Sequence, residues 1–143
     1  MKEFPISALA QIINAEPVTD TGVFTGVSID SRTTKTGDCF FAIPGENFDG
    51  HDYIADAFSK GAVCVVVSKD IEDKKPADKS ILKVANTIKA LGDFAHDYRQ
   101  NAGYKVVAIT GSAGKTTTRQ IVYQVLNRHF PVHQSPKSFN NNI

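Results

Sequence analysis

The sequence lacks an apolar run long enough to cross a membrane, and its N-terminus lacks the long apolar core of a secretory signal peptide. It also lacks an excess of either charge, because 16 Lys and Arg residues stand against 15 Asp and Glu residues and give a net charge of +1. That balance provides no bulk attraction for nucleic acid or for an anionic membrane. We therefore expect a cytoplasmic protein that binds no nucleic acid and inserts into no membrane.

Cysteine is scarce as well. Cys39 and Cys64 each fall inside an apolar, strand-like segment. They form no C-x-x-C motif and no histidine is close to either in sequence, which argues against a zinc site. We expect two small, buried core residues in a reducing compartment, and no metal bound by cysteine.

What the sequence does contain is a phosphate-binding pattern, VVAITGSAGKTTT, at residues 106–118. Residues 106–109 predict a buried strand of a parallel sheet, a glycine loop follows, and Ile121 to Leu126 show helical spacing. Strand, glycine loop and helix in this order bring main-chain N–H groups to the positive end of a helix dipole. Such an arrangement binds phosphate.

Individual loop residues have distinct expected roles. Gly111 and Gly114 permit backbone conformations and a close approach that a Cβ would block. Lys115 can reach the outer phosphates, and the Thr116 hydroxyl can ligate Mg²⁺. The predicted cofactor-binding residues are Thr110, Gly111, Ser112, Ala113, Gly114, Lys115, Thr116 and Thr117.

The motif is G-x-x-G-K-T, shorter than the full G-x-x-x-x-G-K-[ST], because Ile109 occupies the position of the first glycine. The alternative interpretation is a plain glycine turn that joins a strand to a helix, with Lys115 in solvent. The lysine and the three threonines after Gly114 favour phosphate, since a plain turn requires none of them.

The first hundred residues predict a small mixed α/β domain, and Asn101 to Gly103 marks its boundary. Strands are expected over 23–29, 39–43, 62–67 and 81–84, and helices over 7–15, 52–60 and after Asn86. Ser7 and Asn86 are the expected N-caps. The last of these helices shows an apolar stripe of Ile88, Leu91, Ala95 and Tyr98, with His96 beside it on the surface.

The predicted division is therefore 1–101 for this domain and 102–143 for a second unit. The second unit would hold the first strand, the phosphate loop and the helix of a parallel-sheet ATPase domain. Even with a second strand at residues 132–134, two strands and one helix cannot close a core by themselves. We accordingly expect a fragment of a longer enzyme.

With these residues in hand, the chain resembles the N-terminal part of the ATP-dependent Mur ligases of bacterial peptidoglycan synthesis. Residues 28–32 and 37–42 resemble the S-x-D-S-R and G-D-x-F-x-A segments of that family. Residues 45–52 resemble its G-x-x-x-D-G-H-x loop, and residues 110–117 its T-G-[TS]-x-G-K-T-[TS] ATP loop. Order and spacing agree across nearly the whole chain.

The resemblance implies an ADP-forming carboxylate–amine ligase that uses ATP and Mg²⁺. A peptide carboxylate would attack the γ-phosphate of ATP, and an amine would then displace phosphate from the resulting acyl phosphate. Such chemistry needs charge neutralisation at the transferred phosphoryl group, which is the role expected of Lys115 as the catalytic residue and of Thr116 as the metal ligand.

Residues 138–143 resemble the corresponding segment of family members that join D-Ala-D-Ala to UDP-MurNAc-tripeptide. Those two molecules are the substrates that the resemblance implies. The alternatives are a sibling that adds the third amino acid of the peptide, another ligase of the superfamily such as a folylpolyglutamate synthase, a P-loop switch or kinase, and a non-catalytic UDP-sugar-binding module.

The resemblance also implies a substrate site. Its expected residues are Ser31, Arg32, Phe48, His51, Asn140 and Asn141. Ser31 and Arg32 would bind the pyrophosphate, Phe48 would stack on or line the uracil site, and His51 would donate a hydrogen bond. Each has a competing interpretation. Ser31 and Arg32 would only form an exposed turn at the end of a strand. Phe48 would pin its loop to the core, and Asn140 and Asn141 would only fold a turn. Other parts of the family's machinery are missing, so we expect no ligase activity from this chain alone.

Overall fold

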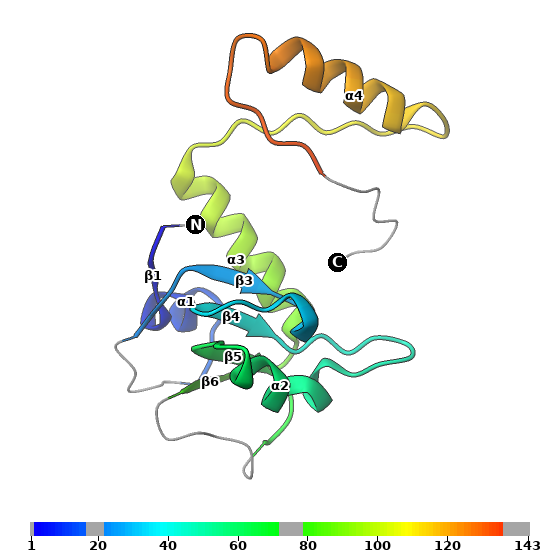
Figure 1. Ribbon diagram of the computed structural model, residues 1–143. Helices are drawn as coiled ribbons and strands as arrows, with labels where there is room; N and C mark the ends of the chain where they lie inside the picture. The colour runs from blue at the N-terminus through cyan, green and yellow to red at the C-terminus, as the bar shows by residue number, and fades with distance from the viewer. Residues whose placement is uncertain (1, 17–21, 72–78, 136–143) are drawn as a thin grey trace. The chain divides into compact units, whose positions relative to one another are not determined.

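The computed structural model describes residues 2–16, 22–71 and 79–135 (Figure 1). The chain divides into two compact units, Met1–Gly103 and Tyr104–Ile143, called here the first and second units. The sheets lie in the first unit, and the second unit contains one described helix. In the part of the chain that the structure describes, no helix is long and apolar enough to span a membrane.

A four-stranded parallel sheet forms the centre of the first unit. Its strands are β3 (Gly26–Ser28), β4 (Asp38–Phe41), β5 (Cys64–Val67) and β6 (Ser80–Lys83), in that spatial order. In the register of the sheet, Val27 of β3 lies opposite Cys39 of β4, and Cys39 lies opposite Cys64 of β5. The two inner strands are buried on both faces, which explains why their sequences are continuous apolar runs. The predicted mixed α/β fold of the first domain is confirmed, and its central sheet is parallel.

Helices cover both faces of this sheet. Because strand side chains alternate between faces, Phe41 and Val66 pack with α1 (Ile6–Ile12) and α3 (Thr87–Ala102), whereas Phe40 packs with α2 (Ile54–Ser59). A short antiparallel pair, β1 (Phe4–Pro5) and β2 (Val23–Phe24), adjoins α1. Both cysteines lie in the core as unpaired thiols, and burial raises the pKa of Cys39 well above its usual range.

Three local predictions need correction. The expected strand over 23–29 is interrupted at Thr25, whose N–H donates to the Gly37 carbonyl at 2.8 Å. Ser7 is not an N-cap, because β1 runs directly into α1 with Pro5 at the cap position. The helix expected from residue 52 starts as a 3-10 turn over Gly50–Tyr53, and its α-helical part begins at Ile54. By contrast, the Asn86 cap is confirmed, since its side chain accepts from the Lys89 N–H at 2.9 Å.

The strand expected over 106–109 is absent. Val106 and Val107 are 62% and 63% exposed, and residues 104–110 have no regular secondary structure. A strand needs a neighbour for its main-chain hydrogen bonds, and no segment among the described residues pairs with this one. The helix after the glycine loop does form, as α4 (Lys115–Leu126).

The apolar stripe of α3 agrees with the predicted one only in part: Leu91 and Tyr98 pack against the core. Ala90 and Phe94 are its buried apolar residues, whereas Ala95 is exposed. The Phe94 ring meets the Phe4 ring edge-on, with centroids 5.2 Å apart, and the Phe24 ring at 5.8 Å. This aromatic cluster attaches α3 to the β1–β2 pair.

We therefore predict that Phe94→Ala lowers the free energy of unfolding by about 3–5 kcal/mol, because it removes a buried ring and leaves a cavity. The control is His96→Ala on the same helix, where the side chain is exposed and the expected change is within about 0.5 kcal/mol. Denaturant unfolding of the two variants measures both quantities. Equal stabilities would contradict the assigned packing of α3.

Candidate functional site

The predicted phosphate loop has the local geometry of an anion site. Gly111 has φ +147° and Gly114 has φ +78°, a region that side chains other than glycine rarely adopt. Gly114 is the N-cap of α4 and contributes no side chain to the cap. The first-turn N–H groups of this 12-residue helix have no acceptors earlier in the helix, so they are directed toward the loop.

Lys115 adds a cation to this loop. It is the first residue of α4, and its Nζ donates to the Gly111 carbonyl oxygen at 2.6 Å. The ammonium group is thus folded back over the loop, where it contacts a main-chain oxygen and, among the residues that the structure describes, no carboxylate. A phosphate oxygen could take the place of that carbonyl without breaking an ion pair. Residues 110–117 are all exposed to solvent.

The predicted substrate residues of the first unit lie beyond one edge of the parallel sheet. The 3-10 turn Ser31–Thr33 follows the end of β3, and the loop with Phe48 and His51 follows the end of β4. Because β3 and β4 are parallel neighbours, both segments leave the sheet at its carboxyl edge. Ligands of open α/β sheets bind outside this edge.

The turn after β3 is fixed by its own polar groups. Asp30 accepts from the Arg32 N–H at 2.9 Å, and its carboxylate pairs with the Arg32 guanidinium at 2.7 Å. These side-chain and main-chain hydrogen bonds from Arg32 lower the pKa of Asp30 to about 2. The Arg32 side chain is 84% exposed. Arg32 is therefore accessible to an anion, which would have to share the guanidinium with Asp30.

Ser31 is placed differently from Arg32. It is 5% exposed, and its main-chain oxygen accepts from Lys60 Nζ at 3.0 Å. Hydrogen bonds from Lys60 and from the Ser31 side chain lower the pKa of Asp56. The Ser31 hydroxyl is thus directed into the protein toward α2, and of the two predicted side chains only Arg32 reaches solvent.

The loop after β4 presents one large aromatic side chain. Pro44 and Asp49 form a bridge, and the Gly45 N–H donates to the Phe48 carbonyl at 2.9 Å. Phe48 itself is 72% exposed. The alternative that Phe48 pins its loop to the core is therefore wrong.

His51 is enclosed, in contrast to Phe48. It is 4% exposed, with Nδ1 2.5 Å from Asp49 Oδ1, and Nε2 accepts from the Ser68 N–H at 3.0 Å. Since Nε2 is an acceptor, the ring proton belongs on Nδ1. Both ring nitrogens are occupied within the protein, so the hydrogen bond expected from His51 to a substrate has no free donor here.

The Asp49–His51–Ser68 arrangement resembles a hydrolase relay, because Ser68 Oγ lies 3.3 Å from Nε2. However, the Ser68 main-chain N–H already occupies Nε2 at the shorter distance, and the ring is buried. Asp49 also pairs with Lys69, and the Lys69 ammonium is the main group that holds the Asp49 pKa well below its usual range. We interpret the cluster as structural.

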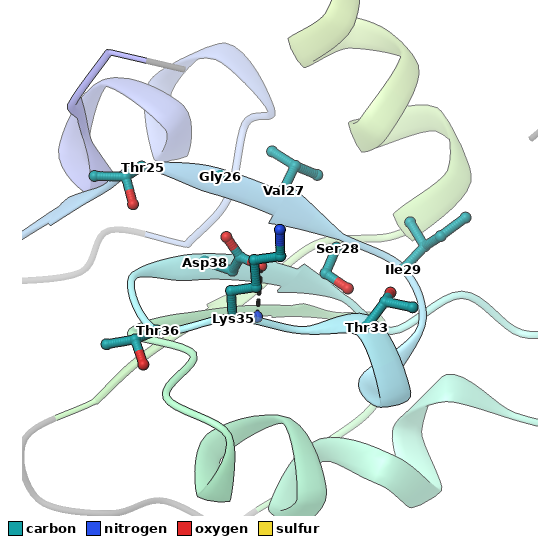
Figure 2. A pocket seen from close by; sticks show the side chains of 9 residues that line it. All are labelled: Thr25, Gly26, Val27, Ser28, Ile29, Thr33, Lys35, Thr36 and Asp38. Atoms are coloured by element: carbon teal, nitrogen blue, oxygen red, sulfur yellow. Dashed lines mark hydrogen bonds between the residues drawn. The ribbon is translucent and has the colours of Figure 1, made fainter. Parts of the chain in front are cut away.

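A shallow pocket of about 610 Å³ lies beside β3 (Figure 2). Its polar lining comes from Thr25, Ser28, Thr33, Lys35, Thr36 and Asp38, and its remaining walls from Gly26, Val27 and Ile29. Asp38 accepts from the Lys35 N–H at 2.8 Å. None of the predicted site residues lines this pocket. Its walls come from β3 and the residues beside it, from the end of the 3-10 turn, from the following loop and from the first residue of β4.

Two predicted residues, Asn140 and Asn141, lie outside the described residues. Among the others, the structure brings Ser31 and Arg32 together in one turn and Phe48 and His51 together in one loop. Sequence reasoning missed Lys60 and Ser68, which bind these segments through hydrogen bonds across 29 and 17 residues. No local motif marks such partners.

Comparison with known proteins gives one family. The description "Mur ligase family, catalytic domain" matches residues 23–99. A UDP-N-acetylmuramoyl-tripeptide–D-alanyl-D-alanine ligase of Bacillus subtilis is 34% identical over 90% of this chain and 28% of its own length. A ligase of the same name from Rickettsia prowazekii is 47% identical over 80% of this chain and 25% of its own length.

Solved structures agree with these relatives. A crystal structure of MurF from Acinetobacter baumannii matches with a TM-score of 0.77 and 32% identity, over 92% of this chain and 29% of that one. MurF ligase from Thermotoga maritima in complex with ADP matches with a TM-score of 0.69 and 32% identity, over 80% of this chain and 26% of that chain. The chain thus spans about a quarter of the length of the relatives it matches.

The Asp30–Arg32 pair gives a testable titration. Because the folded-state pKa of Asp30 is lowered to about 2, stabilisation by the pair is present at neutral pH and is lost as pH falls from about 4 toward 2. In Arg32→Gln we expect the Asp30 midpoint to rise toward 3.8. Carboxyl carbon NMR measures this, with Asp49 as the unchanged control. An unaltered Asp30 midpoint would rule out the assigned pairing.

Proposed function

This chain belongs to the Mur ligase family, and on that premise we propose that it is the N-terminal part of an ATP-dependent ligase that joins D-Ala-D-Ala to UDP-MurNAc-tripeptide. The supporting observation is the glycine loop at the N-terminus of α4, where the Lys115 ammonium donates to the Gly111 carbonyl and pairs with no carboxylate of the described residues. Relatives with this named activity match 80–90% of the chain.

The proposed division of labour follows the two units. Residues 1–101 bind the UDP end of the substrate, and residues 102–143 open the ATP-binding domain. At the sheet edge, Arg32 offers a guanidinium to the diphosphate, and the exposed Phe48 ring offers an apolar face to uracil. Ser31 and His51 support these two side chains from inside, given their burial. The roles of Asn140 and Asn141 and the cytoplasmic location stay predictions.

The proposed reaction forms an amide in two steps. A carboxylate oxygen of the peptide attacks the γ-phosphorus of ATP, so that ADP leaves and an acyl phosphate forms. The amine nitrogen of D-Ala-D-Ala then attacks the acyl carbon, phosphate leaves, and the nitrogen loses a proton. The main-chain N–H groups of residues 111–114 and the Lys115 ammonium neutralise phosphate charge as it is transferred.

Residues that fit Mg²⁺ are present at the same loop. Thr116 follows Lys115 in the first turn of α4, and its hydroxyl is a hard oxygen ligand of the kind Mg²⁺ binds beside phosphates. The ion, when bound, supplies positive charge between the phosphates. Holding it next to the loop is the role proposed for Thr116.

A second candidate function is the addition of the third amino acid of the peptide. It is favoured by the match to a UDP-N-acetylmuramoyl-L-alanyl-D-glutamate–2,6-diaminopimelate ligase of Aquifex aeolicus, 39% identical over 71% of this chain and 20% of its own length. The D-Ala-D-Ala reaction is preferred because a relative with that name is 47% identical over 80% of the chain, against 39% over 71% for the Aquifex aeolicus ligase.

Lys115→Met tests the phosphate site. Loss of a charged hydrogen-bond donor to phosphate is expected to weaken MgATP binding about 10- to 100-fold. Lys105→Met, an exposed lysine of the same unit, is the matched control and should bind like the parent. Titration calorimetry with MgATP gives both constants. Equal affinity of the two variants would refute the role of Lys115.

The isolated chain is expected to lack turnover. It aligns with only 20–28% of the length of relatives that are named as ligases, so the groups that bind the amine and complete the active centre belong to the remainder. The measurement is ADP release from purified chain with UDP-MurNAc-tripeptide, in the presence and absence of D-Ala-D-Ala. Release that depends on D-Ala-D-Ala would overturn this expectation.

A further inference from the structure

We propose that His51 is a positioning residue that holds the loop of residues 44–49 so that Phe48 stands ready to receive a uracil base. The inference rests on the proposed function, since it concerns how the uridine end is bound. It assigns His51 an indirect role, through Asp49 and the main chain, in place of direct contact with the ligand.

The loop is closely fitted to the end of β4. The Gly50 N–H donates to the Ile43 carbonyl at 2.9 Å, and the Gly45 N–H donates to the Phe48 carbonyl at the same distance. A Cβ at Gly50 would lie 2.6 Å from Ile43 N and 2.9 Å from the Ala42 main chain. The loop therefore packs directly on the strand that it leaves.

The His51 ring joins this loop to the next strand. Its Nδ1–H donates to Asp49, the last residue of the loop, and its Nε2 accepts from the main chain of Ser68, directly after β5. Lys69 pairs with the second oxygen of Asp49. The buried imidazole thus connects the carboxyl ends of two neighbouring parallel strands, β4 and β5.

Phe48 is the side chain whose position depends on these hydrogen bonds of the loop. A single exposed apolar side chain is ordinary on a protein surface. Here, however, the ring stands on a loop whose main chain is hydrogen-bonded and whose two ends are held, so little main-chain freedom remains to be lost when a ligand binds. A pre-ordered aromatic face suits stacking on a planar base.

The test is a double-mutant cycle on uridine diphosphate binding by the 143-residue chain, measured by titration calorimetry. Phe48→Ala should weaken binding about 5- to 150-fold, the range of lost base stacking. His51→Ala should weaken it as well, and the double variant should bind no more weakly than Phe48→Ala alone. Such non-additivity indicates that His51 acts through Phe48.

Conservative variants of His51 test its two ring contacts one at a time and distinguish a lost contact from a misfolded protein. His51→Asn keeps a donor near the Nδ1 position, and His51→Gln keeps an acceptor near Nε2. Each should bind uridine diphosphate more weakly than the parent and more tightly than His51→Ala. His96→Ala, an exposed histidine on α3, should leave binding unchanged. In every folded variant MgATP affinity should be unaltered, and exchange of the Gly45 and Gly50 amide hydrogens should be faster wherever His51 is changed.

The outcomes distinguish this inference from the proposed function. If the parent chain does not bind uridine diphosphate, both the positioning role of His51 and the proposed uridine site are wrong. Binding that Phe48→Ala weakens but His51→Ala leaves intact would overturn only the positioning role. Additive losses in the double variant would also overturn it, because they would mean that His51 contacts the ligand directly.

Discussion

Parallel pairing of β3, β4 and β5 is the constraint on which the rest of this structure depends. Each strand pairs with the next along the chain, and so each connection must return across a face of the sheet. As a result, the segments after the three strands leave at one edge. The turn with Arg32, the loop with Phe48, and Ser68 are neighbours for that reason, although 36 residues separate the first from the last.

Polar groups at this edge are largely paired within the protein. Asp30 neutralises Arg32, and Asp49 is bound by both His51 and Lys69. The Asp49–His51 contact is enclosed, whereas Arg32 and Lys69 are exposed, so water screens the other two pairs and they contribute little to stability. Their consequence is geometric, since they fix two short turns that have few apolar contacts of their own. An anionic ligand then meets an ordered surface whose guanidinium it must share with Asp30.

The second unit depends on local chemistry instead of long-range packing. Positive φ at two glycines, a helix N-terminus and one lysine within five residues produce the anion-binding geometry without help from distant segments. Ile121 and Val125 of α4 remain exposed in this unit, as does the segment 104–110. The loop therefore has this geometry even though the segment before it forms no strand.

The sequence alone determined what depends on neighbours in the chain: the α/β alternation, the continuous apolar runs of the two inner strands, the Asn86 cap, and the glycine turn that leads into α4 at Lys115. It placed the strand at 106–109 wrongly because pairing requires a partner that periodicity does not report. It also predicted Ser31 and His51 as ligand contacts, whereas both residues are buried and hydrogen-bonded to Lys60 and Ser68, which are distant in the chain. Only the tertiary structure decided which side chains of the two loops reach solvent, because burial depends on segments that the fold brings together.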